Sequence, residues 1–244
     1  MSSTHYIAMW SGPRNISTAM LRAWENRPDT IVVDEPLYAH YLLKTGIEHP
    51  GAEEIIAYYE TDWRAVVKQI TAPLPDGKTI YYQKHMNHHL LHDMDWEWVL
   101  KLSNAFLIRE PARVIVSMAK VLPSLEISQT GFPQQIALFN YLRERTGATP
   151  PVIDTQDVLM NPRAILSQLC DQLGVPFMES MLRWPAGKRD TDGIWAKYWY
   201  ASVEQSTGFM PYEPTASSVP DHLTNLLDEC NAIYAQLRSY RIQA

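Results

Sequence analysis

Short runs of β-branched and aromatic residues alternate with longer segments of helical spacing along this chain. The short runs are expected to form strands at residues 6–10, 30–33, 79–83, 105–108 and 151–154, which are mostly apolar, as buried parallel strands are. The longer segments are expected to form helices at 17–26, 52–70, 95–103, 112–121, 133–146, 162–173 and 220–239. Such alternation is typical of a parallel sheet with helices on both faces, so the sequence predicts a three-layer α/β fold.

The composition is that of an ordinary globular protein. The 244 residues are 46% hydrophobic and 20% charged, which favours one domain over residues 1–244. Residues 184–218 contain several Gly, Pro, Trp and Tyr without clear periodicity and are interpreted as an ordered loop with short helical pieces. Cys170 and Cys230 have no paired spacing, so they are interpreted as core residues of a protein from a reducing compartment.

The net charge and the N-terminal sequence narrow the choice of partners. A formal net charge of -6 disfavours bulk attraction to nucleic acid or to an anionic membrane. The N-terminus lacks a basic region followed by an apolar run, and no long apolar segment occurs elsewhere, so a cytoplasmic location is expected. The oligomeric state stays open. Any bound phosphate must be held by local geometry.

The loop after the first predicted strand has the character of an anion site. It runs from Ser11 directly into a helix, and such a loop presents unpaired backbone N–H groups and the positive end of a helix dipole. Arg14, Ser17 and Thr18 add a guanidinium and two hydroxyl donors. A plain turn with a Ser or Thr N-cap explains the same residues. The loop lacks the G-x-x-x-x-G-K-[ST] pattern, which disfavours a Walker A site.

A second segment makes the prediction more specific. Arg109 ends an apolar strand, and Ser117 follows eight residues later on the next predicted helix. Together the two segments resemble the sulfotransferase superfamily, whose fold is of the P-loop nucleotide-binding type. The resemblance implies that Arg109 and Ser117 bind the 3'-phosphate of 3'-phosphoadenosine 5'-phosphosulfate and that the first loop binds its 5'-phosphosulfate. The loop residues concerned are Gly12, Pro13, Arg14, Asn15, Ile16, Ser17 and Thr18.

The resemblance covers most of residues 6–177. The stretch DEPLYAHY at 34–41 is similar to bacterial and plant sulfotransferase-like proteins, some of which are named branched-chain aminotransferase-like, and nothing in the sequence indicates pyridoxal phosphate. Two departures stand out. Ile16 occupies a position that is often Gly in the superfamily, which implies a different backbone path or weaker donor binding. The segment that closes over the donor is matched loosely, and Lys188 and Arg189 are the donor contacts that it implies.

Sulfuryl transfer requires a base for the acceptor and cations near the bridging oxygen. Glu35 follows the strand at 30–33 and resembles the catalytic Glu of several sulfotransferases, so it is the predicted base, although a salt-bridging role before Pro36 also fits. His85 is the rival, because a Lys-His pair follows the third strand. Lys84 and Arg14 are the predicted cations. The product would be adenosine 3',5'-bisphosphate.

Histidines and aromatic residues leave further alternatives. His85, His88, His89 and His92 would share one face of a helix, but the implied chemistry needs no metal, and no metal site is expected. The aromatic cluster at 195–200 is either core or part of the acceptor wall.

The sequence therefore favours a sulfotransferase that acts on a hydroxyl or amine of a small or peptidic acceptor. A non-catalytic nucleotide-binding or regulatory module is the alternative, with Ile16 as its sequence hint. A small P-loop kinase is the third reading, disfavoured by the missing Walker lysine pattern.

Overall fold

A computed structural model describes residues 4–122, 124–214 and 218–243. Its strands are β1 His5–Ser11, β2 Thr30–Asp34, β3 Ile80–Met86, β4 Ser103–Ile108 and β5 Val152–Asp154. They form one five-stranded sheet in the order β2-β3-β1-β4-β5, and all four pairings are parallel. The carboxyl ends of the strands therefore lie along one edge, where open α/β sheets bind ligands.

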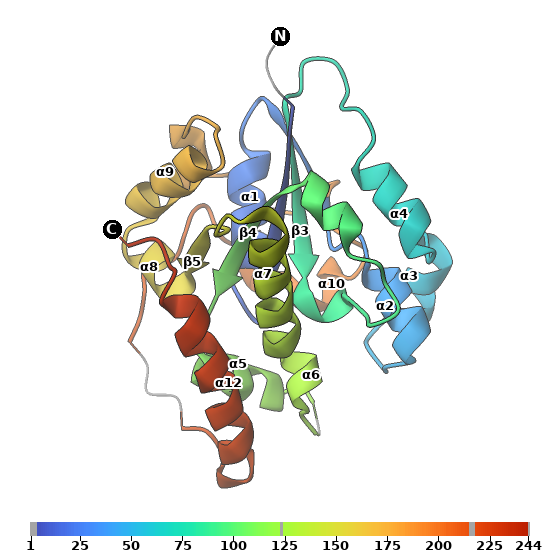
Figure 1. Ribbon diagram of the computed structural model, residues 1–244, viewed down its shortest axis with the longest axis vertical. Helices are drawn as coiled ribbons and strands as arrows, with labels where there is room; N and C mark the ends of the chain where they lie inside the picture. Colours follow the sequence, from blue (N-terminus) through green and yellow to red (C-terminus); the bar gives the residue numbers. More distant parts are fainter. Residues whose placement is uncertain (1–3, 123, 215–217, 244) are drawn as a thin grey trace.

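Helices cover both faces of this sheet (Figure 1). The α-helices are α1 Ser17–Glu25, α2 Tyr38–Thr45, α3 Ala52–Tyr58, α4 Trp63–Ile70, α5 Pro111–Ala119, α6 Ile127–Thr130, α7 Phe132–Thr146, α8 Thr155–Met160, α9 Pro162–Gln172, α10 Ala196–Trp199, α11 Ala201–Glu204 and α12 Thr224–Arg238. Short 3-10 helices are η1 Asn87–His89, η2 Glu97–Lys101, η3 Glu179–Leu182 and η4 Asp221–Leu223.

The alternation of side chains along β1 separates the two halves of the core. Ile7 and Met9 pack with residues of α1 and α9, whereas Ala8 and Trp10 pack with residues of α4, α7 and α12. Successive side chains of a strand point to opposite faces, and a strand covered on both faces is apolar throughout. The predicted three-layer α/β fold is confirmed. Cys170 and Cys230 are buried and free, as predicted.

Several predicted helices differ from the observed ones. The segment 52–70 forms two helices, α3 and α4, because Tyr59 is extended and Asp62 starts the second helix by accepting a hydrogen bond from the backbone N–H of Arg64. The segment 95–103 forms only the 3-10 helix η2, and Ser103 already belongs to β4. Helices α2, α6 and α8 were not predicted; each has eight residues or fewer, too short to show a clear period. Residues 215–217 of the predicted loop lie outside the described part.

The histidine-rich segment does not form the single helical face considered from the sequence. His85 lies within β3, which continues to Met86, whereas His88 and His89 lie in η1 and His92 lies beyond it. Adjacent residues of a strand point to opposite faces, so Lys84 and His85 face different layers of the molecule.

Candidate functional site

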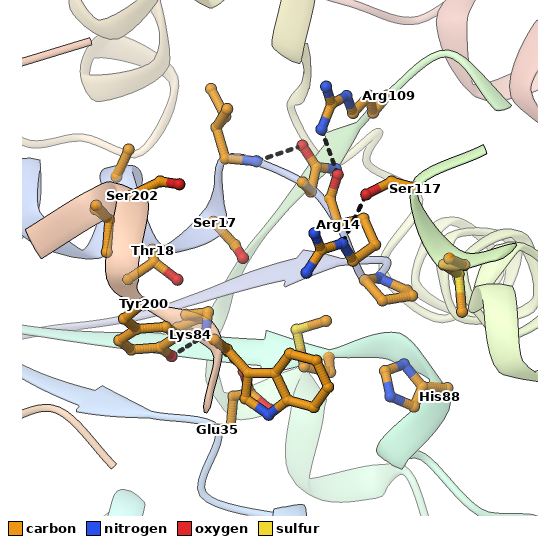
Figure 2. A pocket seen from close by; sticks show the side chains of 18 of the residues that line it. Arg14, Ser17, Thr18, Glu35, Lys84, His88, Arg109, Ser117, Tyr200 and Ser202 are labelled. Atoms are coloured by element: carbon orange, nitrogen blue, oxygen red, sulfur yellow. Dashed lines mark hydrogen bonds and ion pairs between the residues drawn. The ribbon is translucent and has the colours of Figure 1, made fainter. Parts of the chain in front are cut away.

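A cavity of about 410 Å³ lies at the carboxyl edge of the sheet, and Figure 2 shows its main side chains. Its walls include residues of the first loop, Glu35, Lys84, Arg109 and Ser117. These residues come from the ends of β1, β2, β3 and β4 and from α5. The fold thus brings most of the predicted phosphate-binding residues and the predicted catalytic residues Arg14, Glu35 and Lys84 to one site.

Helix α1 begins at this cavity without a side-chain cap. Ser17 is its first residue, and no described side chain caps its first turn. The first N–H groups of a helix have no partner inside the helix and attract anions. Pro13, Arg14, Ser17 and Thr18 line the cavity next to these groups.

The loop follows a different backbone path from the one a glycine at position 16 would suggest. Ile16 has an ordinary φ of -87°, whereas Arg14 is left-handed with a φ of 55°. Ile16 also packs against the buried core beneath α1. The isoleucine therefore causes no backbone strain. The left-handed conformation that favours glycine occurs in this loop at Arg14 and not at Ile16.

Asn15 and Gly12 support the loop from behind. The Asn15 amide donates to the Leu107 carbonyl at 3.2 Å, and its oxygen accepts from Ile16 N–H at 2.9 Å and from the hydroxyl of Thr155. A Cβ on Gly12 would lie 2.8 Å from the Thr130 carbonyl oxygen, so glycine permits close packing against α6. Gly12 does not line the cavity, so it acts by allowing this close packing and not by contacting a ligand.

Arg14, Arg109 and Ser117 form one connected group (Figure 2). Arg14 Nε donates to Ser117 Oγ at 2.8 Å, and Arg109 Nη1 donates to the Arg14 carbonyl. Within the described residues, no carboxylate forms an ion pair with Arg14 or Arg109, and the buried Nε of Arg109 has no partner. Burial and the neighbouring Arg113 and Arg14 lower the pKa of Arg109. This end of the cavity therefore carries uncompensated positive charge suited to an anion.

Lys84 is the centre of a buried polar network at the other end. Its Nζ lies 2.8 Å from Asp34 Oδ1, 2.6 Å from Glu35 Oε1 and 2.8 Å from the Tyr200 hydroxyl. Tyr200 in turn donates to Asp34 Oδ2 at 2.5 Å. Burial alone would lower the pKa of Lys84, but the two carboxylates outweigh it and hold that pKa well above its usual value. Lys84 therefore stays charged.

Glu35 lines the cavity beside Lys84 in an unusual conformation. Its φ is 43°, and Arg14 and Glu35 are the non-glycine residues with positive φ in the described part of the chain. Such backbone strain concentrates at functional sites. Burial raises the pKa of the Glu35 carboxyl, with Lys84 opposing and Asp34 reinforcing the shift.

His85 does not reach the cavity. Its ring stacks on Trp10 with centroids 4.3 Å apart, and its Nε2 lies 3.1 Å from Gln83 Oε1. Burial lowers its pKa to about 3. The alternation of β3 that brings Lys84 to the cavity turns His85 into the opposite layer, so the geometry does not support His85 as the base.

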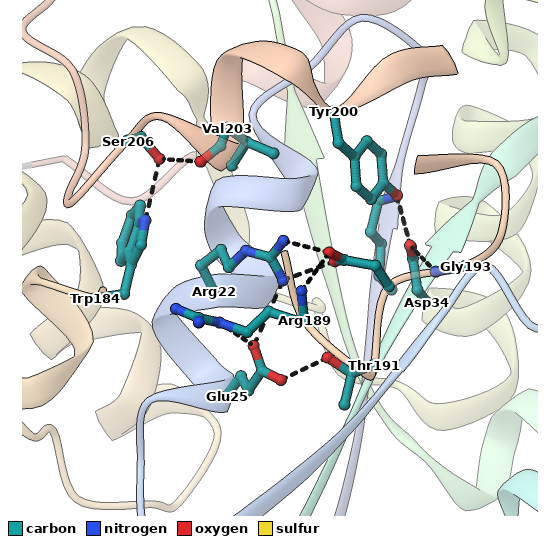
Figure 3. Close-up of polar contacts among 12 residues, drawn as sticks. Arg22, Glu25, Asp34, Trp184, Arg189, Thr191, Gly193, Tyr200, Val203 and Ser206 are labelled. Carbon is teal, nitrogen blue, oxygen red and sulfur yellow. Dashed lines mark hydrogen bonds and ion pairs between the residues drawn. The ribbon is translucent and has the colours of Figure 1, made fainter. Parts of the chain in front are cut away.

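Lys188 and Arg189 also lie away from the cavity. Lys188 is exposed, and Arg189 contacts Glu25, with Nε and Oε2 3.5 Å apart. Arg22 of α1 forms an ion pair with Asp192 at 2.7 Å, which ties this loop to the C-terminal half of α1. Figure 3 shows Arg189 beside Arg22 and Glu25 of that helix. The predicted donor contacts at Lys188 and Arg189 are not brought to the site. Gly208, Phe209 and Met210 line it instead, and no sequence pattern singled them out.

The aromatic cluster at 195–200 is divided between the core and the cavity wall. Trp195 is 2% exposed and belongs to a buried cluster, whereas Trp199 and Tyr200 line the cavity. Tyr200 is a site residue that sequence reasoning named only as one member of this cluster. Its contact with Lys84 joins positions 116 residues apart, which no local pattern reveals.

Comparison with known proteins agrees with this geometry. The sulfotransferase domain family matches residues 5–240. The chain belongs to this family. The sulfotransferase from Alicyclobacillus acidocaldarius has the same fold, with a TM-score of 0.54 at 12% identity over 99% of this chain and 98% of the other. The sulfotransferase domain of the Synechococcus PCC 7002 olefin synthase gives 0.53 at 16% identity over 95% and 96%.

Two Arabidopsis thaliana proteins are similar in sequence. Branched-chain-amino-acid aminotransferase-like protein 2 is 34% identical over 234 residues, or 96% of this chain and 41% of its own length. Branched-chain-amino-acid aminotransferase-like protein 1 is 34% identical over 240 residues, or 98% and 43%. The chain thus spans less than half of these relatives, and the resemblance to plant proteins so named is confirmed.

Residues 4–122, 124–214 and 218–243 contain no helix long and apolar enough to cross a bilayer. Among the same residues, no three His, Cys, Asp or Glu side chains are grouped so that they could hold a metal ion.

Proposed function

We propose that this protein transfers the sulfuryl group of 3'-phosphoadenosine 5'-phosphosulfate to a hydroxyl or amine of a small acceptor. One observation carries the proposal. The start of α1, which no described side chain caps, lines the same cavity as the Glu35–Lys84 pair, together with Arg14 and Arg109, which have no carboxylate partner among the described residues. Membership of the sulfotransferase domain family supports it.

The residues present fit such a donor. Its 5'-phosphosulfate would lie against the α1 N-terminus between Arg14, Ser17 and Thr18. Its 3'-phosphate would accept hydrogen bonds from Ser117 and from Arg109, whose buried Nε lacks a partner in the described chain. A buried donor left without a partner is unfavourable, so a phosphate oxygen at this position would relieve it.

The reaction makes one bond to sulfur and breaks another. The acceptor oxygen or nitrogen bonds to the sulfur while the bond from sulfur to the bridging phosphate oxygen breaks, and that oxygen takes the electron pair. Glu35 accepts the acceptor's proton. Lys84 and Arg14 stabilise the charge that develops on the bridging oxygen. Lys84 is already held beside Glu35 by Asp34 and Tyr200, so little reorganisation is required.

Arg109→Ala is expected to weaken binding of adenosine 3',5'-bisphosphate by about 10- to 100-fold, the usual loss for a charge-assisted hydrogen bond. AMP lacks the 3'-phosphate, so its affinity should fall only slightly, because the variant also removes the hydrogen bond from Arg109 to the Arg14 carbonyl. Calorimetric titration of both nucleotides without magnesium measures this. Arg143→Ala on α7, away from the cavity, is the matched control. Equal losses for both nucleotides would contradict the assignment of Arg109.

The dependence of turnover on pH tests the environment of Glu35. A base acts when it is deprotonated, and burial raises the pKa of Glu35 above 4.5. The acidic limb of kcat/KM is therefore expected above the pH at which an exposed glutamate titrates, and activity falls as pH drops through that raised value. A profile that stays flat down to pH values near an ordinary carboxyl pKa would exclude Glu35 as the base.

A protein that binds the bisphosphate tightly but transfers sulfate to no hydroxyl or amine would instead be a nucleotide-binding module. The sequence hint for that alternative was Ile16, and its ordinary φ removes the strain argument. A panel of acceptors with labelled donor distinguishes the two functions.

A further inference from the structure

The end of the cavity beyond Glu35 is built from a rigid group of rings. His89 lies between Tyr38 and Tyr41, stacked at centroid distances of 4.9 and 4.8 Å. His88 meets Tyr41 edge-on at 5.1 Å, and the Tyr38 hydroxyl lies 2.9 Å from His49 Nδ1. All five rings line the cavity. Stacked rings in a close-packed interior cannot rotate freely, so their polar edges have fixed directions.

Two of these imidazoles have hydrogen-bonding atoms without partners. His88 is 8% exposed and His89 is 1% exposed, and among the described residues His88 Nδ1 and both ring nitrogens of His89 have no hydrogen-bond partner. Figure 2 shows His88 on the side of the cavity where Glu35 and Lys84 lie, away from Arg109. A native structure seldom leaves such atoms unpaired, so they indicate where a ligand's polar groups belong.

The charges around this end exclude ionic ligands. Burial lowers the pKa of His88 to about 3 and that of His89 well below its usual value, so both rings are neutral. A carboxylate would face Glu35, and Lys84 is already shared between Asp34 and Glu35. An ammonium would lie beside the charged Lys84, and the carboxylates nearby are already paired with that lysine. An uncharged ligand with hydrogen-bonding groups avoids both the repulsion from Glu35 and the repulsion from Lys84.

Distances and volume limit the ligand further. Glu35 Oε2 and His89 Nε2 are 3.9 Å apart, too far for a hydrogen bond to each other but close enough for one hydroxyl oxygen to contact both. His88 Nδ1 then remains for a second polar group. In this proposal the cavity of about 410 Å³ also accommodates the donor's phosphates, which favours a small ring over a larger acceptor.

We propose that the acceptor is a small uncharged ring compound with at least two hydroxyl groups. One hydroxyl is held between Glu35 and His89 and receives the sulfuryl group. The other hydrogen-bonds to His88, which selects hydroxylated rings over singly substituted ones. This inference rests on the proposed function, because it names the acceptor for that reaction.

The test compares matched small probes with the protein saturated with adenosine 3',5'-bisphosphate. Catechol and resorcinol carry two hydroxyls, phenol carries one, and salicylate and 2-(aminomethyl)phenol carry a charge. Calorimetry is expected to show at least one of the two diols binding about tenfold or more tightly than phenol, with both charged compounds weaker than phenol. Diols no tighter than phenol, or a charged compound that binds best, would overturn the inference.

The variant His88→Phe retains the ring and removes its nitrogens. This variant is expected to bind diols and phenol with about equal affinity, because its affinity for the diols falls while its affinity for phenol stays unchanged. His88→Gln supplies a hydrogen-bonding group again and should restore part of the preference, which also covers the case in which the phenylalanine variant does not fold. His222→Phe, an exposed histidine on η4, is the matched control. A preference that survives in both His88 variants would refute the role of His88.

Turnover with labelled donor separates the two proposals. Tight diol binding without sulfate transfer would contradict the proposed function and leave the acceptor site standing. Efficient transfer to salicylate or to 2-(aminomethyl)phenol, with slow transfer to the diols, would support the function and overturn the inference about the acceptor.

Discussion

Glu35→Gln is expected to reduce turnover by about 10²- to 10⁴-fold, the usual effect of removing a positioned general base. Glutamine keeps the shape of the side chain and an oxygen that accepts from Lys84, whereas it has no basicity. Lys84 keeps its ion pair with Asp34, so the network loses one of its two carboxylates. Single-turnover measurements with labelled donor report the loss, and bisphosphate affinity should change little.

Two controls accompany this variant. Glu179→Gln removes an exposed carboxylate paired with Arg163 outside the cavity and should leave turnover unchanged. His85→Asn tests the rival base, and because His85 packs on Trp10 in the opposite layer, it should lower stability more than activity. Retained turnover in Glu35→Gln together with its loss in His85→Asn would give the base role to the histidine.

Lys84→Met is expected to destabilise the fold by about 3–5 kcal/mol, because removing one partner leaves uncompensated buried charge. Lys84 is 1% exposed, and its Nζ lies 2.8 Å from Asp34 Oδ1 and 2.6 Å from Glu35 Oε1. Methionine has a similar length and fills the space, so the lost volume is a minor factor. Urea unfolding at neutral pH measures the loss of stability.

If buried charge causes the loss of stability in Lys84→Met, the size of that loss depends on pH. Protonation removes the buried negative charge, so the deficit relative to the unaltered protein should shrink as pH falls and be largest at neutral pH and above. Adding Asp34→Asn to Lys84→Met should recover part of the stability. Lys68→Met, at an exposed lysine on α4, should change stability by about 0.5 kcal/mol or less. A deficit in Lys84→Met that is the same at every pH would point to packing instead of charge.

Local sequence was sufficient for the architecture, and the family resemblance added the residues predicted to bind phosphate. The sheet and the strand–loop–helix unit around Arg14 follow from the spacing of apolar residues, which depends on neighbours in the chain. Arg109 and Ser117 were assigned to the same site by the resemblance to the sulfotransferase superfamily. The structure brings both to the cavity because parallel strands end at one edge of the sheet and α5 starts just after β4.

The remaining features depended on tertiary packing. Whether Lys84 or His85 faced the cavity was decided by which side of β3 met α1, and one residue of shift reverses the answer. Lys188 and Arg189, which were predicted as donor contacts, do not line the cavity, and the loop that carries them is held by the contact of Asp192 with Arg22, 170 residues apart. Tyr200 reaches Lys84 only after the chain has folded back across the sheet. The sequence by itself therefore determined the layers of the fold and, through the family resemblance, named the residues at the Arg14–Arg109 end of the cavity. Long-range ion pairs and ring packing decided which side chains line the end around Lys84 and Glu35.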